Sequence, residues 1–370
     1  MIRLAAIALL GRADTPTDAV EEYCRYLGEA FRAQGIGLAI ERVPWEHRGW
    51  RRALRSLRRR AKMWKGLWVV VQYTALAWSS RGFPLRFPRV LEILKRAGVR
   101  VAVVYHDVEP FAGTRFIDRL RRHTQLRAMR QAMDLCDMAV FTVPMEKLSW
   151  MQPQYRHSVF IPVGANLPAA GEGVSRKSLA RGGKLNIGVF SVTGGSATQK
   201  EIGEIVEAVR FASARVRNLK LTVLGRNSKP TEDEFRRRLD GVPVEIQVLG
   251  VLSNEDVART LSSCDVLLFV RGPISTRRGS AIAGIACGLP VIAAEGPETC
   301  SLIADAGVAF YTPQKKSDLG AVLLHVLQDE HYRASLAQRS WIAQQRYFSW
   351  TVIASRYAEF LEKDAPPSSA

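Results

Sequence analysis

Short runs of apolar and β-branched residues alternate with longer segments of helical periodicity along the whole chain. An apolar run of about four to eight residues predicts a buried strand, whereas apolar residues that recur every third or fourth position predict a helix. Regular alternation of the two is typical of βα units around a mostly parallel sheet. The pattern therefore predicts an α/β fold, with ligands bound at the carboxyl ends of the strands.

This alternation occurs twice, which predicts two doubly wound domains. In the first series we expect strands at 3–10, 37–43, 67–72, 99–105, 138–143 and 158–163, and helices at 17–34, 46–65, 88–97 and 116–133. In the second series we expect strands at 184–190, 219–224, 244–248, 266–270, 290–293 and 308–311, and helices at 199–214, 232–239, 254–263, 280–287 and 316–328. One long helix, about 330–362, is expected before a frayed tail.

The composition shift between the two series sets the domain boundaries. We expect an N-terminal Rossmann-like domain at 1–166, a linker at 167–183 that is rich in Gly, Ala, Pro and Ser, and a C-terminal Rossmann-like domain at 184–345. Residues 346–370 are expected to form a helix that packs back toward the first domain, followed by the tail. A chain of 370 residues is long enough for two ordinary domains.

Composition narrows the class of protein. The chain is 47% hydrophobic and 24% charged, as in a globular protein. Its five cysteines are widely spaced and form no C-x-x-C pair, which argues against a disulfide framework or a zinc site and favours a reducing cytosol. No apolar run is long enough to span a membrane. We expect no metal and no cofactor, because no cluster of Asp, His or Cys resembles a metal site.

Charge changes this picture, because the net charge is +18 and is unevenly distributed. Residues 1–166 hold 28 Lys and Arg against 14 Asp and Glu, whereas the remainder holds 25 against 21. The helix at 46–65 combines basic residues with tryptophans at helical spacing, and 115–130 is a second basic segment. The residues expected to bind an anionic membrane surface are Trp50, Arg51, Arg55, Arg58, Arg59, Trp64 and Lys65. The alternative is that the apolar stripe packs against the sheet, and both can hold.

Residues 279–293 carry the most specific pattern in the chain. The helix expected there ends in Ala-Cys-Gly-Leu-Pro-Val-Ile-Ala, where Gly288 can end the helix in a left-handed conformation and Pro290 prevents its continuation. This stretch resembles the donor-domain signature of retaining glycosyltransferase family 4. The resemblance implies the GT-B architecture, in which two doubly wound Rossmann-like domains face each other across a cleft.

Other stretches resemble the same family in the same order. They are 161–166, 224–226, 249–252, 264–268 and 296–298, with a weaker likeness at 105–107. The resemblance implies a hexosyl- or glycosyltransferase that takes a sugar from a UDP- or GDP-linked donor without a metal. The chain departs from the family at its paired glutamates, whose places hold Ser275 and Ala283.

Two turns of the second domain are candidates for binding the donor diphosphate. Arg277, Arg278, Gly279 and Ser280 begin a helix whose free N–H groups, together with two guanidinium groups, attract an anion. The alternative is an exposed loop whose arginines are solvated.

The second turn holds Gly194 and Gly195, followed by Lys200 in the next helix. Lys200 matches a lysine with which the family holds the diphosphate, while Gly195 occupies the place of the family's arginine. A tight turn without a ligand is the alternative. The nucleoside is expected near Arg226, Gly250, Val251 and Leu252, where the resemblance places the base.

The candidate catalytic residues are His106 and Asp107, at the end of a strand, and Asp14, in the first loop. An imidazole can donate a hydrogen bond to the donor sugar or move a proton, and a carboxylate can act as the base if the reaction inverts configuration. The alternatives are a core histidine and, for Asp14 and Asp18, capping of the first helix.

The sequence therefore predicts a glycosyltransferase that modifies a lipid-linked or polysaccharide acceptor, peripherally bound at the inner face of the cell membrane. A catalytically silent homologue that binds sugar nucleotide or polysaccharide is the alternative, because the paired glutamates are missing. An epimerase on the same frame is a third possibility. Nucleic acid is not an expected partner, since no groove-reading motif accompanies the basic residues.

Overall fold

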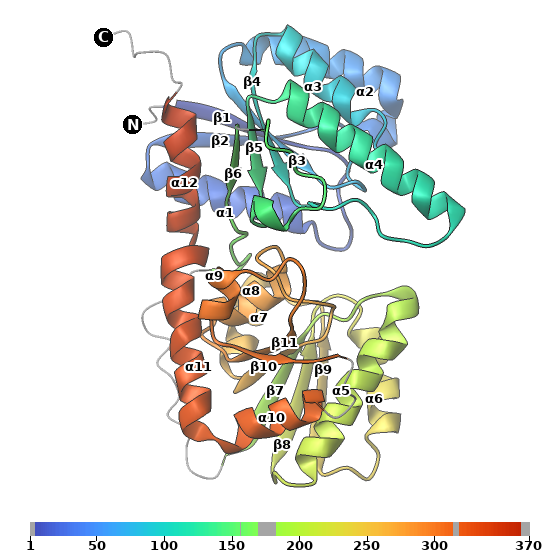
Figure 1. Cartoon of the computed structure of the whole chain (residues 1–370), viewed down its shortest axis with the longest axis vertical. Helices are drawn as coiled ribbons and strands as arrows, with labels where there is room; N and C mark the ends of the chain where they lie inside the picture. Colours follow the sequence, from blue (N-terminus) through green and yellow to red (C-terminus); the bar gives the residue numbers. More distant parts are fainter. Residues whose placement is uncertain (1–3, 156, 169–182, 314–317, 364–370) are drawn as a thin grey trace. The chain divides into compact units, whose positions relative to one another are not determined.

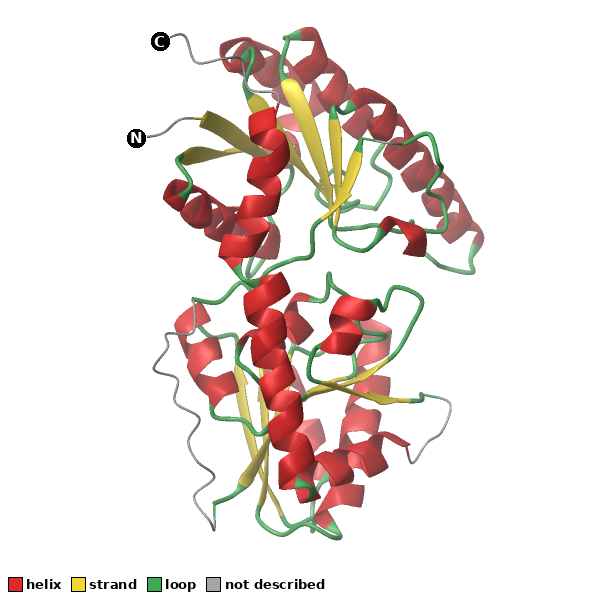
Figure 2. Ribbon diagram, turned by 60° about the vertical axis from the view of Figure 1, so that its left-hand side comes forward, coloured by secondary structure: helices red, strands yellow, loops and turns green. Residues whose placement is uncertain are grey.

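The computed structural model describes residues 4–155, 157–168, 183–313 and 318–363. The chain forms two compact units (Figures 1 and 2). Unit 1 comprises Met1–Pro162 and Trp350–Ala370, and unit 2 comprises Val163–Ser349. Most of the linker expected at 167–183, and the tail, lie outside the described residues.

Unit 1 contains a parallel sheet that is six-stranded over the described residues. Its strands are β1 (Leu4–Leu10), β2 (Ile36–Arg42), β3 (Trp68–Tyr73), β4 (Arg100–Tyr105), β5 (Met138–Phe141) and β6 (Ser158–Phe160), in the order β2-β1-β3-β4-β5-β6. Its helices are α1 (Ala19–Ala33), α2 (Trp45–Ala61), α3 (Phe87–Arg96), α4 (Phe116–Leu135) and α12 (Trp350–Lys363). Helices α2, α3 and α4 cover one face of the sheet, and α1 and α12 cover the other (Figure 1).

Unit 2 repeats this design with a second parallel sheet, again six-stranded where the chain is described. Its strands are β7 (Leu185–Phe190), β8 (Leu219–Leu224), β9 (Val244–Gly250), β10 (Val266–Phe269), β11 (Val291–Ala294) and β12 (Val308–Tyr311), in the order β12-β11-β10-β7-β8-β9. Its helices are α5 (Thr198–Ser213), α6 (Glu232–Arg238), α7 (Asn254–Ser262), α8 (Gly279–Ala286), α9 (Ser301–Asp305), α10 (Asp318–Gln328) and α11 (Glu330–Ala343).

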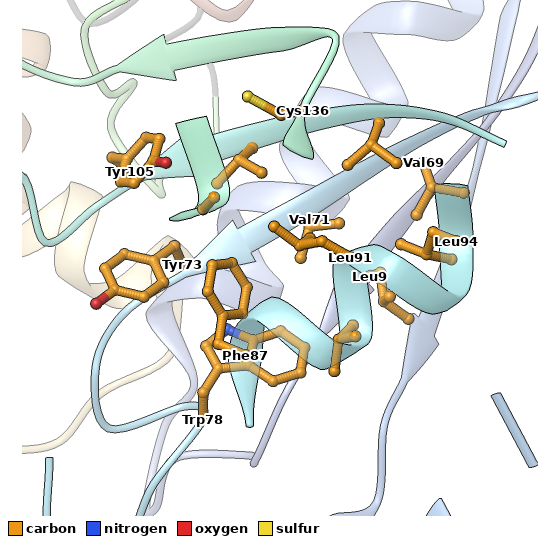
Figure 3. Close-up of a cluster of buried hydrophobic side chains, with 14 of the residues drawn as sticks. Leu9, Val69, Val71, Tyr73, Trp78, Phe87, Leu91, Leu94, Tyr105 and Cys136 are labelled. Atoms are coloured by element: carbon orange, nitrogen blue, oxygen red, sulfur yellow. The ribbon is translucent and has the colours of Figure 1, made fainter. Parts of the chain in front are cut away.

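Helices cover both faces of each sheet, so the central strands are buried on both sides. Every residue of β3 is buried, and its sequence reads as a continuous apolar run rather than an alternating one. In unit 1, α3 lays Phe87, Leu91 and Leu94 over this strand, and the rings of Phe87 and Tyr73 lie 4.8 Å apart (Figure 3). A second core of the same kind fills unit 2.

The predicted α/β fold is confirmed, and each expected strand is present with its ends shifted by at most a few residues. Three helices differ from expectation. The helix expected at 46–65 is kinked at Gly49, whose φ of 69° and ψ of 153° are not helical, and it ends at Ala61. Helix α9 was not expected, because a five-residue helix is too short to show periodicity. The helix expected at 330–362 is broken, because a π-helical turn at Gln344–Phe348 leads into Ser349, whose ψ of 143° is extended.

The break at Ser349 separates two helices that pack in different units. Helix α12 lies against α1 in unit 1, where the hydroxyls of Tyr23 and Tyr357 are hydrogen-bonded at 3.0 Å in a fully buried setting. Trp68 Nε1 donates to the Leu361 carbonyl oxygen at 3.1 Å, which joins α12 to β3. The last helix of the chain is therefore an integral layer of the first unit.

Substitution of one tyrosine of the buried pair should cost more than substitution of both. Tyr357→Phe leaves the Tyr23 hydroxyl without its partner in a dry core, which should lower the free energy of unfolding by about 1–3 kcal/mol. The double variant Tyr23→Phe, Tyr357→Phe removes both polar groups and should recover part of that loss. Calorimetric melting of the wild type, the two single variants and the double variant measures this, and a double variant that is no more stable than Tyr357→Phe would contradict it.

Candidate functional site

The strand order of unit 2 reverses at one point. The chain builds β7, β8 and β9 outward in one direction and then adds β10 on the other side of β7. Where the order reverses, the connections that leave the two strands diverge, and ligands of open α/β sheets bind outside the carboxyl ends of the strands at this place. The connections that leave it here are 191–197, after β7, and 270–278, after β10.

The connection after β7 is held in place by its own hydrogen bonds. Ser191 has a φ of 68°, which residues other than glycine rarely adopt, and its N–H donates to the Leu224 carbonyl oxygen at 2.7 Å. The N–H of Thr193 donates to Glu201 Oε2 at 2.7 Å, and Thr198 Oγ1 donates to the Thr193 carbonyl oxygen at 2.6 Å. The loop is thus anchored to the first turns of α5.

Gly194 and Gly195, predicted to bind the diphosphate, lie in this loop. Gly195 has a φ of 75°, and a Cβ built on it would meet no atom within 4 Å, so the loop has open space at this residue. Lys200 follows in α5, and its Nζ lies 3.7 Å from Glu204 Oε1 with the side chain 80% exposed. An exposed pair of this kind contributes little free energy, so the Lys200 ammonium stays available to a ligand.

The guanidinium of Arg277, which we expected to bind phosphate, is paired with a carboxylate of this chain. Its Nε and Nη2 donate to the two carboxylate oxygens of Glu298 at 2.7 and 2.8 Å, and Ser275 Oγ donates to Glu298 Oε2 at 3.0 Å. Burial alone would raise the pKa of Glu298, but the hydrogen bonds from Arg277 and Ser275 and the charge of Arg278 outweigh burial and lower it. This bidentate pair engages the Arg277 guanidinium and braces the loop, and the role of Arg277 in holding phosphate stays a prediction.

The other residues predicted at this turn have different surroundings. Arg278 is half-buried and precedes the first residue of α8. Gly279 is exposed, and a Cβ built on it would meet no atom within 4 Å, so the first turn of α8 is sterically open. Ser280 is half-buried in the same turn. Gly279 and Ser280 thus lie in a first helical turn that an anion can approach, and the predicted contacts of all four residues with phosphate stay predictions.

The residues predicted around the nucleoside follow β8 and β9. The Gly225 N–H donates to the Gly250 carbonyl oxygen at 2.6 Å, which joins the ends of these strands. Arg226 and Leu252 are half-buried, and Val251 is an apolar side chain that is 50% exposed. These residues lie at the same carboxyl edge as the two connections, on the β8 and β9 side of β7.

Sequence reasoning missed Arg271, which lies in the connection after β10. Its Nε donates to Thr193 Oγ1 at 3.3 Å, so it joins the two connections that diverge at the reversal of strand order. Burial and the nearby charge of Arg226 lower the pKa of Arg271, and Glu201 opposes them. The sequence did contain a signal for this residue. Arg271 is a charged residue only two positions after a strand that is buried throughout, at the edge where ligands bind.

A cavity of about 240 Å³ borders the same edge between α5 and the connection after β8. It is lined by Gly194, Gly195, Thr198, Gln199, Ile202, Asn227, Pro230, Thr231 and Glu234. None of these described lining residues is a lysine or an arginine, and one is a glutamate. The cavity is therefore poorly suited to phosphate, and the cationic side chains of the edge lie around the reversal point instead.

Comparison with known proteins agrees with this arrangement. Residues 188–329 match the family model described as "Glycosyl transferases group 1", and no curated protein matches the chain by sequence. Among solved structures, Anabaena HepE in complex with UDP and glucose has a TM-score of 0.67 and 15% identity, with 98% of this chain and 100% of that chain covered.

Two further structures agree. Sucrose-phosphate synthase from Thermosynechococcus elongatus has a TM-score of 0.67 and 17% identity, with 98% and 99% of the two chains covered. WaaG, a glycosyltransferase involved in lipopolysaccharide biosynthesis, has a TM-score of 0.64 and 14% identity, with 96% and 99% covered. In family match and in fold, this chain resembles the GT-B glycosyltransferases.

In unit 1 of this GT-B chain, His106 follows β4 and is held as a neutral imidazole. Gln72 Nε2 donates to the Val70 carbonyl oxygen at 3.3 Å, which turns Gln72 Oε1 toward His106 Nε2 at 2.8 Å. Burial lowers the pKa of His106 to about 4, although the charge of Asp18 opposes the shift. His106 is therefore a hydrogen-bonding group and a weak proton acceptor near neutral pH.

The two candidate carboxylates of unit 1 each accept a backbone hydrogen bond. Asp107 Oδ2 accepts from the Ala75 N–H at 2.7 Å, which ties the ends of β3 and β4 together. Asp14 is exposed and accepts from the Thr15 N–H at 2.9 Å. The N-cap of α1 is Asp18, which accepts from Val20 and Glu21, so the capping alternative holds for Asp18. Among the described residues, no group of three or more His, Cys, Asp or Glu could hold a metal ion.

The predicted membrane helix corresponds to α2 and the turn after it. Trp64 is 7% exposed within the core of unit 1, and Trp50 is partly buried with its ring stacked on Trp45 at 5.1 Å. The two tryptophans are therefore packing residues, which corrects their predicted contact with lipid. The basic residues Arg51, Arg55, Arg58, Arg59 and Lys65 are exposed as expected.

Helix α4 begins with a group of exposed apolar residues. Phe116 is 82% exposed and Ile117 is 44% exposed, and Leu120, one turn further along the helix, is 45% exposed. Arg119 and Arg122 are exposed beside them. Met63, in the turn after α2, is 73% exposed. We call Phe116, Ile117 and Leu120 the α4 patch. The sequence signal was present in the second basic segment, which interleaves these residues with arginines.

Replacement of Glu298 by glutamine should destabilise the protein in a pH-dependent manner. The variant loses the ionised acceptor of three hydrogen bonds, so it should unfold about 1–3 kcal/mol more easily at pH 7. Since the pKa of Glu298 is lowered by folding, its stabilisation is complete above the pKa of an unfolded glutamate, about 4.3, and disappears as the pH falls through the folded value.

Urea unfolding of the wild type and Glu298→Gln between neutral and acidic pH measures this difference. The exposed Glu207 on α5 provides a control, because Glu207→Gln should leave stability nearly unchanged. A stability difference for Glu298→Gln that is as large in acid as at neutral pH would contradict the ion pair.

Proposed function

We propose that this protein transfers a sugar from a nucleotide-diphosphate sugar to a lipid-linked or polysaccharide acceptor at the cytoplasmic face of the cell membrane. The observation that carries the proposal is the set of cationic side chains at the carboxyl edge of unit 2, inside the region that matches glycosyl transferases. A UDP-linked donor is the first candidate, because three structures of the similar HepE hold UDP, UDP and glucose, or UDP-glucose. A GDP-linked donor is the second.

The leaving group sets the chemical requirement. Loss of the sugar leaves a second negative charge on the β-phosphate, and positioned cations that stabilise this charge lower the barrier. Lys200 and Arg278, with the open first turns of α5 and α8, supply such groups without a metal ion. Metal-independent transfer is therefore the mechanism that we propose.

The acceptor side is proposed to lie at the carboxyl edge of unit 1. His106 is neutral, and because its Nε2–H donates to Gln72 Oε1, its Nδ1 is left as an acceptor for a substrate hydroxyl. The Asp14 carboxylate accepts from the Thr15 N–H and that of Asp107 from the Ala75 N–H, and each keeps lone pairs with which it can act as a base. Asp14 is the more exposed of the two, so we propose it as the first candidate for the base.

Attachment to the membrane is proposed to run through the helical face α2–α3–α4 of unit 1. The α4 patch offers apolar side chains to the acyl boundary, and Arg119 and Arg122, with the exposed arginines of α2, offer charge to anionic headgroups. No described helix is both long and apolar enough to cross a bilayer.

A catalytically silent homologue is the second candidate function. The places of the family's paired glutamates hold Ser275 and Ala283, which are 0% and 2% exposed. Neither side chain can carry the charge of a carboxylate. A silent homologue would bind the nucleotide sugar and leave it intact.

Donor binding should appear as thermal stabilisation by one nucleoside diphosphate among UDP, GDP, ADP and TDP. A ligand at about a hundred times its Kd stabilises the folded state by about 2.7 kcal/mol. Arg278→Ala should weaken this ligand, whereas Arg217→Ala, in the connection that enters β8 at the opposite edge of the sheet, should not. Release of the diphosphate from the sugar conjugate separates the transferase from the silent homologue. Absence of stabilisation by every nucleotide would overturn the donor proposal.

Membrane binding should depend on the α4 patch. Phe116→Ser combined with Leu120→Ser removes two side chains, each worth about 1.5–3 kcal/mol when fully buried, so binding to anionic vesicles should weaken at least about tenfold. Ile342→Ser on α11, at a residue that is 51% exposed, is the matched control. Co-sedimentation with phosphatidylglycerol vesicles measures this, and equal binding of wild type and double variant would remove the α4 patch from the proposal.

A further inference from the structure

Arg271 is a cation at the reversal point that is attracted by the charge of Glu201 but forms no ion pair with it. Among the described residues it forms no ion pair, and its one hydrogen bond is the donation from Nε to Thr193 Oγ1. This differs from Arg277 nearby, whose charge is neutralised by Glu298. A half-buried guanidinium that lacks a carboxylate is costly unless an anion joins it.

The remaining donors of Arg271 are accessible. A guanidinium carries five N–H groups, of which only that on Nε is used by a described residue. The side chain as a whole is half-buried, but neither Nη atom is among the buried atoms that lack a hydrogen-bond partner. The Nη groups therefore present a planar pair of donors that matches two oxygens of a phosphate.

We infer that Arg271 binds the diphosphate of the nucleotide sugar, and that it supplies from the end of β10 the guanidinium that the connection after β7 lacks at Gly195. The inference rests on the proposed function, because it names a further binding residue of the same site.

Three features of the fold make Arg271 suited to this role. Strands β7 and β10 are neighbours, so a side chain that leaves β10 reaches the β7 connection across one strand spacing. The bond to Thr193 fixes its direction, and Thr193 is itself held by Glu201 and Thr198. Arg226, at the end of β8, adds a second positive charge to the same edge. The guanidinium is thus preorganised, which lowers the entropy cost of binding.

The test compares ligands that differ in phosphate number. Calorimetric titration of wild type, Arg271→Gln and the control Arg217→Gln uses UDP, UMP and inorganic pyrophosphate as probes. Arg271→Gln should weaken UDP and pyrophosphate by about tenfold to a hundredfold, as expected for a charge-assisted hydrogen bond, and UMP by less. Arg217→Gln should leave all three unchanged.

Two more variants separate contact with the ligand from support of the loop. Thr193→Val removes the hydrogen bond and keeps the charge, so it should weaken UDP less than Arg271→Gln does. Arg271→Lys keeps the charge without the fork of donors and should restore part of the lost affinity. If Thr193→Val equals Arg271→Gln and lysine restores nothing, Arg271 merely holds the loop and the inference is wrong.

The probes also distinguish this inference from the donor proposal. Unchanged UDP and pyrophosphate affinity in Arg271→Gln would overturn the role of Arg271 and leave the donor proposal standing. Pyrophosphate binding that requires Arg271, with no binding of UDP, GDP, ADP or TDP to wild type, would support Arg271 as a phosphate residue and overturn the nucleotide donor. Binding of no probe to wild type would overturn both.

Discussion

The reversal of strand order between β7 and β10 is the constraint on which the candidate site depends. Parallel strands end at a common edge, so every connection that leaves a carboxyl end reaches the same side of the sheet. At the reversal the two connections run in opposite directions, so neither covers the carboxyl ends of β7 and β10. A single topological step therefore brings Thr193, Arg271 and the first turn of α8 to one edge, although they are distant in sequence.

Sequence reasoning gives most of the fold, because strands buried on both faces appear as short apolar runs that need no tertiary information. Strand β3 is an example, because the apolar composition that predicts a strand also predicts that it is buried on both faces. The terminal helix shows the limit of this reasoning. Its residues are helix-compatible throughout, and the break at Ser349 follows from the division of the chain between two units, with Phe348 buried in one and Trp350 against Tyr26 in the other.

Side-chain partners were less predictable than strands, because they depend on elements that meet only in the fold. Arg277 and Arg278 are adjacent and identical in type, yet only the first is neutralised by the bidentate pair with Glu298, which arrives from the connection after β11. The tryptophans of α2 show the same limit. Helical spacing predicts one apolar side, but it does not say whether that side meets a sheet or a lipid.

The pairing of Ser275 with Glu298 bears on the missing glutamates. Ser275 occupies the place of one of them, and its hydroxyl donates to a carboxylate supplied by another connection. A negative charge therefore lies beside Ser275, and Arg277 balances it. A phosphate site beside this pair needs a different cation, because a guanidinium cannot make the same bidentate contact with two anions at once. Arg271 lies at the neighbouring end of the same connection, and this is why we propose it, rather than Arg277, for that contact.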